Sequence, residues 1–305
     1  MSSDRVGFEL AGAGRVDLLE FGASEGVPAL YLHGTPSSAC EAHWLHQPAV
    51  EAGVRIVAVD RLGYHRSAPV PGIDAAAGVY LELVDRLGFD RFAVIGFSGG
   101  ATIALAVAAT ASDRVTVVHL GGALGSLASL RGGELGRVRS TMFGAMSSSR
   151  RLAKTVMGLQ RRSLRKNLAA KLATPSYAVF ELLGGAAAGA QLPALEDYVR
   201  RSSPNDLAAF AEGYLEGADS TDGVLSDLAA FRAPVDFARI TVPVELWHGT
   251  EDRAIPIAAA RVLAAELPSA TLHELDGEGH FVLLSHGREV CAAIANAAHS
   301  ETVKA

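Results

Sequence analysis

The sequence predicts an α/β protein with a mostly parallel central sheet of about eight strands, helices on both faces and an inserted helical cap. Short apolar runs recur along the 305 residues, and a longer helical stretch follows each of them. Most of these runs are continuous rather than alternating, which is typical of strands that are covered on both faces. Strands that alternate with helices in this way form a mostly parallel sheet.

Seven runs are expected to be strands, and the first of them alternates only weakly. Right-handed crossovers bring the carboxyl ends of parallel strands to one edge of the sheet, where open sheets bind ligands. The residues that follow the strands are therefore the first candidates for a functional site. The seven runs are Arg15–Phe21, Pro28–Leu32, Arg55–Val59, Phe92–Ile95, Val115–Leu120, Val242–Trp247 and Ala270–Leu275.

The regular alternation fails between about Leu124 and Asp236, where the chain is helix-like and rich in Ala, Leu and Arg. We therefore expect a helical cap over residues 124–236. It would separate a first part of the core, residues 1–123, from a second part, residues 237–305. Breaks inside the cap fall at Gly184-Gly185, Pro193 and Ser203-Pro204.

Residues 131–171 of this region are strongly basic. They hold eleven Lys and Arg residues and one acid, Glu134, a local charge of +10 in a chain whose net charge is −6. One interpretation is a solvated helix face or a dimer contact, since blocks of like charge usually face solvent. The other is attraction of an anionic substrate, a carrier protein or a membrane surface.

Composition excludes several classes of protein. Apolar residues make up 49% and charged residues 20%, which argues against disorder, and the mild acidic balance argues against general affinity for nucleic acid. Cys40 and Cys291 are the only cysteines and lie far apart, so we expect no disulfide framework, no thiolate zinc site and a reducing compartment.

We expect a cytoplasmic protein with no organic cofactor and no metal. The N-terminus lacks the apolar segment of a signal peptide. The most apolar stretch, Ala101–Ala111, is shorter than the roughly 20 residues that span a bilayer. No glycine-rich phosphate fingerprint follows the first strand, which argues against a nucleotide cofactor.

The segment Gly96-Phe97-Ser98-Gly99-Gly100 joins a predicted strand to a predicted helix and matches the pattern G-x-S-x-G. A side chain that projects from so tight a turn has strained backbone angles. Residues two before and two after it come close together, and glycine at both places avoids a clash. Ser98 would then be exposed at the sheet edge. A glycine-rich turn with an incidental serine, or a helix N-cap, is the alternative.

An acid and a histidine follow the serine in the chain order that this arrangement requires. A serine hydroxyl needs a base to take its proton, and the base needs a group to orient it. Asp252 follows the run Val242–Trp247 and His280 follows the run Ala270–Leu275, so both lie at the same sheet edge as the serine. Three acids before the final strands are alternatives to Asp252, namely Asp222, Asp227 and Asp236.

The chain resembles α/β-hydrolase-fold proteins of the broad esterase, lactonase and epoxide-hydrolase-like group, over nearly its whole length except the cap. The resemblance implies that Ser98 is the nucleophile, His280 the general base and then acid, and Asp252 the group that orients His280. It also implies an oxyanion hole made of the backbone N–H groups of Thr35 and Gly99, although Gly99 is smaller than the family's common residue there. The motifs that carry the resemblance are His33-Gly34-Thr35-Pro36, Asp60-Arg61-Leu62-Gly63-Tyr64-His65-Arg66-Ser67, Gly96 to Gly100, His248-Gly249-Thr250-Glu251-Asp252 and Gly279-His280.

The function that follows is a cofactor-independent serine hydrolase. It would cleave a carboxylic ester or lactone of small to medium apolar character through an acyl-enzyme. Serine at the corner, where family members that open epoxides or displace halide carry a carboxylate, favours acyl chemistry. A C–C bond hydrolase or lyase-type reaction with the same residues, and a ligand receptor without turnover, are the alternatives.

The remaining polar and aromatic candidates are assigned as follows. His65 stands where the family usually has glycine, so it could contact substrate or cap a loop. His33 and His248 are expected to support loops at strand ends, and Glu278 to face solvent. His43 and His46, beside Glu41, are expected on a surface helix rather than at a metal. Candidates for the pocket are Trp44, Phe97, His65, Met142, Phe143, Met146 and Tyr214.

Overall fold

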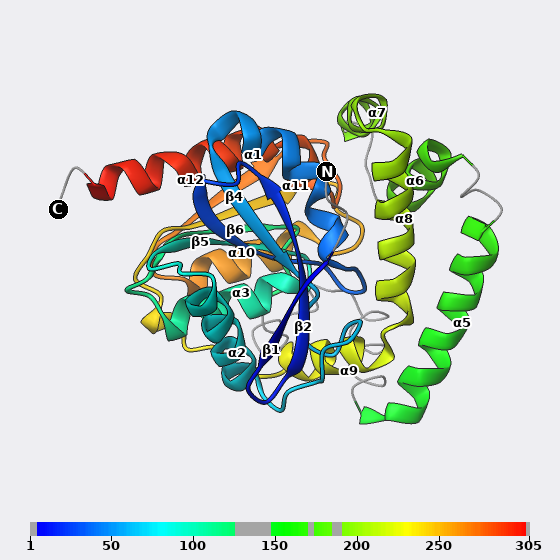
Figure 1. The fold of residues 1–305 in the computed structure, drawn as a ribbon, viewed down its shortest axis with the longest axis horizontal. Coiled ribbons are helices and arrows are strands. Elements are labelled where there is room, and N and C mark those ends of the chain that lie inside the picture. Colours follow the sequence, from blue (N-terminus) through cyan, green and yellow to red (C-terminus); the bar gives the residue numbers. More distant parts are fainter. Residues whose placement is uncertain (1–4, 126–147, 170–173, 185–190, 303–305) are drawn as a thin grey trace.

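The computed structural model describes residues 5–125, 148–169, 174–184 and 191–302. Its core is an eight-stranded sheet in the order β1-β2-β4-β3-β5-β6-β7-β8, which confirms the predicted fold class (Figure 1). The sheet is parallel from β4 to β8, and β2 and β1 add to it in antiparallel pairing. The strands are β1 (Val6–Leu10), β2 (Gly14–Gly22), β3 (Val27–Leu32), β4 (Val54–Val59), β5 (Phe92–Phe97), β6 (Val115–Gly121), β7 (Val244–Gly249) and β8 (Ala270–Leu275).

Strand β1 is the one strand in the described part of the chain that the sequence analysis did not predict. It lies at the sheet edge and pairs with β2 from Val6 opposite Leu18 to Leu10 opposite Gly14. Four of its five residues are exposed or half-buried, and Leu10 alone is buried. An edge strand with so little burial has no apolar run to reveal it, because the apolar signal comes from the core-facing positions.

Helices cover both faces of the sheet. Helices α2 and α3 share one apolar cluster with β3, β5 and β6, whereas α1, α11 and α12 pack in a second cluster on the opposite face (Figure 1). The helices outside the insertion are α1 (His46–Ala52), α2 (Ile73–Arg86), α3 (Gly100–Thr110), α10 (Ile257–Glu266), α11 (Val282–Ser285) and α12 (Gly287–Thr302), with short 3₁₀ helices η1 (Ala39–Leu45) and η3 (Phe237–Arg239).

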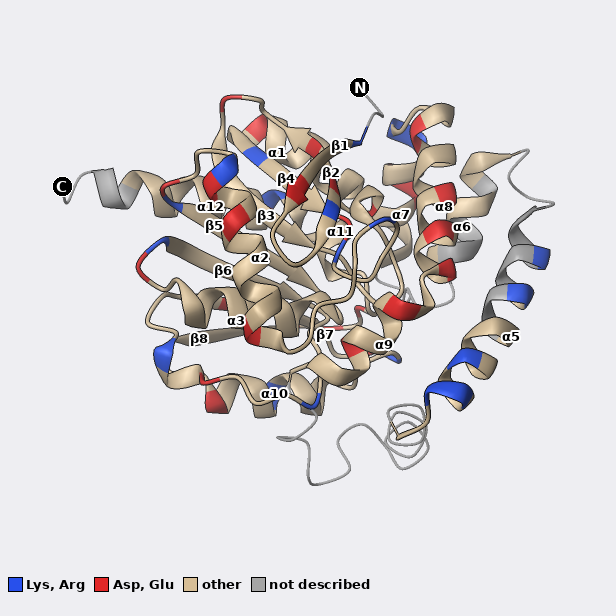
Figure 2. Ribbon diagram, turned by 60° about the horizontal axis from the view of Figure 1, so that its bottom comes forward, with Lys and Arg blue, Asp and Glu red and all other residues tan. Residues whose placement is uncertain are grey.

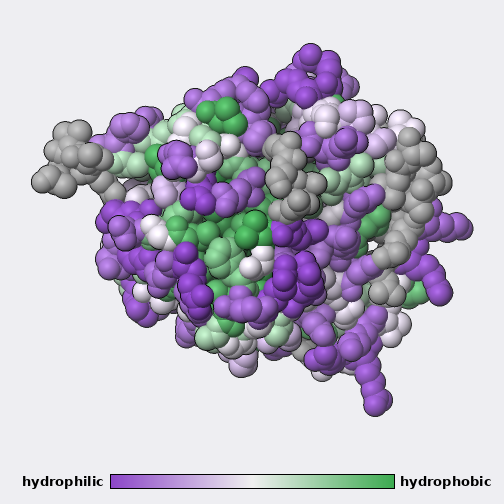
Figure 3. All heavy atoms as spheres, in the orientation of Figure 1, coloured by the Kyte–Doolittle hydropathy of each residue, from purple (hydrophilic) through white to green (hydrophobic). Residues whose placement is uncertain are grey.

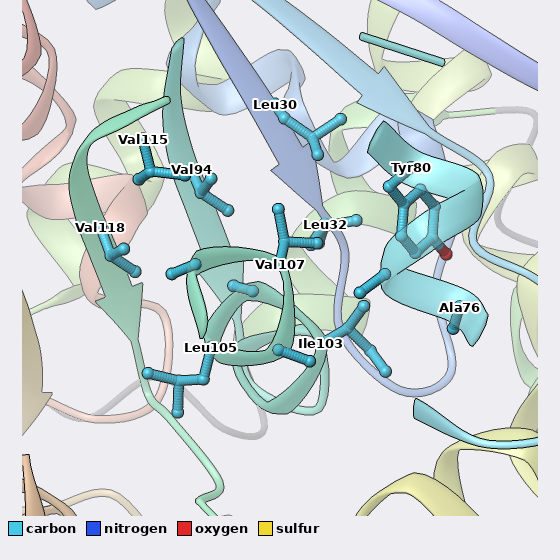
Figure 4. Packing of buried hydrophobic residues seen from close by; sticks show 14 of the residues in the cluster. Leu30, Leu32, Ala76, Tyr80, Val94, Ile103, Leu105, Val107, Val115 and Val118 are labelled. Carbon is cyan, nitrogen blue, oxygen red and sulfur yellow. The ribbon is translucent and has the colours of Figure 1, made fainter. Parts of the chain in front are cut away.

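Helix α3 is the most deeply buried of these helices. Ten of its eleven residues are buried, and it is apolar on all sides, as expected for a helix inside a core. Figure 4 shows side chains of α3 between the strand residues Val94 and Val118 and the α2 residue Tyr80. The helix that follows Ser98 is therefore held by the sheet on one side and by α2 on the other.

Between β6 and β7 the described chain is helical, as predicted. We call the helices α5 to α9 the helical insertion; they lie beside the sheet in Figure 1. Their bounds are α5 (Arg150–Ala169), α6 (Pro175–Gly184), α7 (Leu192–Arg201), α8 (Pro204–Asp219) and α9 (Thr221–Ala230). The limits of a separate cap at residues 124 and 236 stay a prediction.

Hydrophilic side chains cover most of the face shown in Figure 3. The exposed large apolar side chains of the described residues lie on four elements: Val6 on β1, Val50 on α1, Leu152 and Leu159 on α5, and Leu192 on α7. Single exposed apolar residues of this kind are normal for a protein surface. The described segments contain no helix that combines the length and the apolar character needed to cross a membrane.

Candidate active site

Ser98 occupies the turn between β5 and α3, at the carboxyl edge of the sheet. Its φ of 51° is in the left-handed region that residues with a side chain rarely adopt. A Cβ on Gly96 would lie 2.8 Å from Ala101 Cα, and one on Gly100 would lie 2.2 Å from the carbonyl oxygen of Leu32. Both flanking glycines are therefore required by close packing, as the sequence analysis expected, but for a different reason: Gly96 packs against α3 and Gly100 against the end of β3, rather than the two packing against each other.

Gly99 is small because another side chain occupies the space beside it. A Cβ on Gly99 would lie 2.1 Å from Thr35 Oγ1 and 2.9 Å from Phe231 Cζ. Thr35 belongs to the loop after β3, and the Thr35-Pro36 peptide bond is cis. The departure from the family's usual residue at 99 is thus explained by the threonine at 35.

Ser98, His280, Thr35 and Gly99 border one cavity of about 280 Å³. Two of the predicted pocket residues, Phe97 and Tyr214, also line it. The other lining residues are mostly apolar, which is typical of small-molecule sites. They are Gly34, Pro36, Glu41, Leu124, Phe231, Ala254, Ile255 and Phe281.

Asp252 fixes the orientation of His280. His280 Nδ1 lies 2.7 Å from Asp252 Oδ2, and the backbone N–H groups of Ala254 and Ile255 donate to Asp252 Oδ1 at 2.7 and 2.9 Å. Burial raises the pKa of Asp252, but the hydrogen bond and charge of His280 and the other donors outweigh burial and lower it. Because an ionised carboxylate only accepts, His280 Nδ1 is the donor, and Nε2 is left to accept a proton.

The end of β6 links Ser98 to His280. The Ser98 N–H donates to the Gly121 carbonyl oxygen at 2.8 Å. On the next residue, Gly122, a Cβ would lie 2.9 Å from Cε1 of His280, so the imidazole packs directly on that backbone. These two described side chains border the same cavity, and no hydrogen bond joins them.

The two histidines at strand ends support loops. His33 Nδ1 lies 2.8 Å from the Gly34 carbonyl oxygen, and His33 Nε2 accepts from the Arg61 N–H at 3.1 Å. Burial lowers the pKa of His33 and of His248. His248 Nε2 lies 2.8 Å from the Ile255 carbonyl oxygen and 3.3 Å from Asp252 Oδ2, so it braces the loop that carries the carboxylate.

His65 is placed away from the cavity. Its ring lies beside Arg5, Asp60 and Glu216, with Nε2 3.3 Å from a guanidinium nitrogen of Arg5. It is not among the residues that line the cavity, so the expected substrate contact does not match its position. The charged neighbours hold it at the loop after β4. Met142, Phe143 and Met146 lie outside the described residues.

His43 and His46 have partners within the fold. His43 Nδ1 lies 2.8 Å from the Tyr198 hydroxyl, and His46 Nδ1 accepts from the Gly22 N–H at 3.1 Å. Trp44, a further pocket candidate, packs against Phe97 and Phe281 behind the cavity wall. Over the ranges that the structure describes, no cluster of His, Cys, Asp or Glu has the arrangement of a metal site.

The alternative acids occupy other positions. Asp222 is exposed and pairs with Arg150 at 2.6 Å, and Asp236 accepts from the Ala238 N–H at 3.2 Å at the start of η3. Asp227 is buried and forms an ion pair with Arg61, a residue far from it in the sequence. The carboxylate that contacts His280 is that of Asp252.

Glu41 is a pocket residue that the sequence analysis placed only beside two histidines. It is buried, and its Oε1 accepts from the Tyr31 hydroxyl at 2.9 Å and from the Gly34 N–H at 2.8 Å. Burial raises the pKa of Glu41 to about 7, although hydrogen bonds from Ser37, Gly34 and Tyr31 and the charge of Arg61 act in the opposite direction. The sequence feature that could have indicated this role is that Glu41 is an acid in an otherwise uncharged segment after His33-Gly34.

The buried pair of Arg61 and Asp227 was also missed. Both guanidinium NH groups of Arg61 donate to Asp227, and one of them also donates to the Gly34 carbonyl oxygen and to Thr35 Oγ1, each at 3.0 Å. Asp227 Oδ2 further accepts from the Thr35 hydroxyl at 2.5 Å and the Tyr64 hydroxyl at 2.6 Å. The pair joins the loop after β4 to helix α9, and the two residues lie 166 positions apart in the chain, a distance over which local pattern carries no information.

The fold is that of a hydrolase family. A family model described as "Alpha/beta hydrolase family" matches residues 29–293, and the chain belongs to that family. The alpha/beta hydrolase fold protein from Nakamurella multipartita has a TM-score of 0.65 at 25% identity, with 96% of this chain and 98% of that one covered. An esterase from Exiguobacterium antarcticum, at 18% identity, has a TM-score of 0.62 and shares the fold, with 95% and 98% covered.

Two curated relatives carry the name pimeloyl-[acyl-carrier protein] methyl ester esterase. The one from Aromatoleum aromaticum is 38% identical over 106 residues, which is 34% of this chain and 41% of the relative. The one from Chromobacterium violaceum is 41% identical over 64 residues, 21% of this chain and 24% of the relative. The matches therefore span well under half of either relative. Together with the family, they support a hydrolase.

Replacing Gly100 by Ala should destabilise the fold, because the new Cβ meets the Leu32 carbonyl oxygen at 2.2 Å. We expect a loss of about 1–3 kcal/mol in the free energy of unfolding, measured by urea denaturation. Gly78→Ala is the matched control: Gly78 is exposed on α2 with open space around it, and alanine there should stabilise by roughly 0.5–1 kcal/mol. Equal behaviour of the two variants would contradict this packing argument.

Glu41 should make stability fall as pH rises. Its pKa of about 7 in the folded protein exceeds the ordinary 4.5, so between these values the folded protein keeps a proton that the unfolded chain has released. Stability should therefore decrease between about pH 4.5 and 7, by about 3 kcal/mol in total. Urea denaturation of Glu41→Gln across this range should lack that decrease, whereas the surface control Glu266→Gln should keep it. Parallel curves for wild type and Glu41→Gln would refute the assignment.

Proposed function

We propose that the protein is a serine hydrolase that cleaves a carboxylic ester or lactone of a small to medium apolar substrate through an acyl-enzyme, without a cofactor. The observation that supports this most directly is the common cavity bordered by Ser98 and by His280, whose ring is oriented by Asp252. A nucleophile, a base and an orienting acid are the three groups that acyl transfer by serine requires.

The proposed mechanism begins with attack of Ser98 Oγ on the ester carbonyl carbon while His280 Nε2 takes the hydroxyl proton. The negative charge that forms on the carbonyl oxygen is stabilised by the backbone N–H groups of Thr35 and Gly99. Loss of one such donor costs about 2.7–4 kcal/mol in other enzymes. His280 then protonates the departing alcohol, and Asp252 stabilises the imidazolium throughout.

The second half of the mechanism repeats these steps with water. Water gives a proton to His280 and attacks the acyl carbon, the Thr35 and Gly99 N–H groups again hold the oxyanion, and Ser98 leaves with the proton from His280. The carboxylic acid is released. The apolar wall formed by side chains such as Phe231, Ile255 and Phe281 supports an apolar acyl or alcohol group.

The basic helix α5 supports attraction of an anionic substrate or an acidic carrier. It carries seven Lys and Arg residues and no acid, and Figure 2 shows blue segments along it. Ala153 and Met157 of α5 pack in the same apolar cluster as the cavity residues Phe231 and Ile255. The basic side chains of α5 are therefore separated from the cavity by this cluster. Its described basic side chains at 150, 151, 154, 162 and 166 are exposed. Both curated relatives are named for an ester on an acyl-carrier protein.

Ser98→Ala should lower hydrolysis of a neutral activated aryl ester by several orders of magnitude, as expected when a triad nucleophile is lost. A fluorophosphonate should label the wild type at Ser98, as mapped by mass spectrometry, and should not label the variant. Ser112→Ala, at the opposite end of the sheet, is the control and should behave as wild type. Turnover near the wild-type rate in Ser98→Ala would reject the proposal, and labelling without turnover of any ester or lactone in a panel would favour C–C bond cleavage or a receptor.

If α5 attracts an anion, kcat/KM for a carboxylate-bearing ester should fall as salt rises, while that for its neutral analogue stays level. Replacing Arg151 and Lys154 by Gln should reduce the salt dependence. Arg86→Gln, on the surface of α2, removes a charge elsewhere and should leave the dependence intact. A level salt profile for the anionic ester would show α5 to be a solvated face.

A further inference from the structure

The loop Gly34–Pro36, which we call the oxyanion loop, is tied to the helical insertion. Asp227 on α9 receives the Thr35 hydroxyl at 2.5 Å. Arg61, held by the same carboxylate, donates to Thr35 Oγ1 and to the Gly34 carbonyl oxygen, each at 3.0 Å. Thr35 is therefore bound to the Asp227 carboxylate directly, and Gly34 is bound to it through Arg61. Asp227 lies 192 residues after Thr35.

These contacts are strong because they are shielded from water. Asp227 is 2% exposed and Arg61 is 1% exposed. A buried ion pair whose members have further hydrogen bonds is costly to break, since separation leaves an uncompensated charge. Tyr64 completes the set by donating to Asp227 Oδ2 at 2.6 Å. Helix α9 and the oxyanion loop are therefore held together through Asp227 and Arg61.

Helix α9 is seated by a close backbone contact as well. A Cβ on Gly223 of α9 would lie 2.4 Å from the Tyr64 ring, and a Cβ on Gly63 would lie 2.8 Å from Gly223 Cα. Gly63 and Gly223 thus meet backbone to backbone, and the Tyr64 ring packs against α9 beside them. That contact brings Asp227, one turn further along α9, against Arg61 and Thr35.

Thr35 connects this contact to the reacting centre. Its hydroxyl fills the space beside Gly99, where a Cβ would lie 2.1 Å away, and its N–H is one of the two proposed oxyanion donors. Preorganised donors stabilise charge only when they already point at it. A displacement of about 1 Å can cost about a hundredfold in rate.

We propose that Asp227 is a positioning residue that holds the oxyanion loop through Thr35 and Arg61, so that the oxyanion hole is complete only when α9 is packed against the loop. This proposal rests on the proposed hydrolase function. It assigns to the helical insertion a part in the chemical step, besides covering the cavity. The carboxylate does not touch the substrate; it acts through the backbone of Thr35.

The test compares Thr35→Val and Asp227→Asn with wild type on a neutral aryl ester. Thr35→Val removes the hydroxyl that donates to Asp227, and Asp227→Asn replaces one acceptor oxygen by an NH2 donor that faces the donors of Arg61, Thr35 and Tyr64. In both variants kcat should fall about tenfold to a hundredfold with little change in KM. Thr35→Ser keeps the hydroxyl and should retain most of the activity. Asp222→Asn makes the same substitution at an exposed position of α9 and should leave kcat unchanged.

The double variant should be no slower than the slower single variant, because one interaction is lost only once. Hydrogen exchange adds a readout that is independent of turnover. Exchange of the amides in residues 32–38 should rise in Asp227→Asn but not in Asp222→Asn, and exchange in residues 221–230 should rise in Thr35→Val. If Asp227→Asn does not fold, Thr35→Val alone gives both measurements.

Three results would overturn the inference: additive losses in the double variant, a rise in KM with unchanged kcat, or exchange in residues 32–38 and 221–230 that matches the wild type. A wild-type protein without ester turnover would instead reject the proposed hydrolase function. In that case the exchange experiment still decides whether α9 holds the loop. Loss of activity in Thr35→Ser equal to that in Thr35→Val would show that packing at residue 35, rather than its hydroxyl, is what matters.

Discussion

The site depends on the absence of side chains on either side of the corner between β5 and α3. Gly96 lies against the first turn of α3, and Gly100 lies against the carbonyl oxygens at the end of β3. This contact brings the first residues of the largely buried helix α3 to the end of the neighbouring strand, and the N–H of Ser98 is held by β6 at the same time. Three strand ends thus converge on one residue, whose positive φ is stabilised by the packing around it.

The buried carboxyl groups of Asp252, Glu41 and Asp227 show how the surroundings of similar side chains give them different electrostatic properties. Asp252 receives a histidine and two backbone N–H groups, and these donors favour its charged form against burial. Glu41 also receives several donors, but burial dominates and its proton is retained up to about neutral pH. Asp227 forms an ion pair with the guanidinium of Arg61. The three carboxyl groups therefore differ in electrostatic environment, although all three are buried and only Glu41 lines the cavity.

Much of the core could be predicted from the sequence, because its strands are continuous apolar runs that end at glycines and polar residues. Six of these runs and the glycine pattern around Ser98 correspond to observed elements, as does the weakly alternating run that became β2. The contact of Asp252 with His280 also follows from residues placed after consecutive strands. The edge strand β1 could not be found, because it buries one residue only.

What could not be predicted are the contacts made across long stretches of chain. Asp227 was recognised as an acid near the site but its partners lie in loops more than 160 residues earlier, and no local periodicity links them. In the sequence, Glu41 stands beside two histidines and was grouped with them. In the fold its carboxyl group lines the cavity and binds Tyr31, whereas His43 binds Tyr198. His65 shows the reverse: a residue of catalytic type is held by nearby charges outside the cavity.

The shared space of Thr35 and Gly99 has a consequence for how this site can change. Two residues on different loops divide one small volume between them, so a larger side chain at position 99 requires a smaller one at position 35. A library that varies either position alone would sample mostly obstructed combinations. Redesign of the cavity should therefore change the two positions as a pair, and a smaller residue at position 35 without a hydroxyl would lose the hydrogen bond to Asp227 of α9.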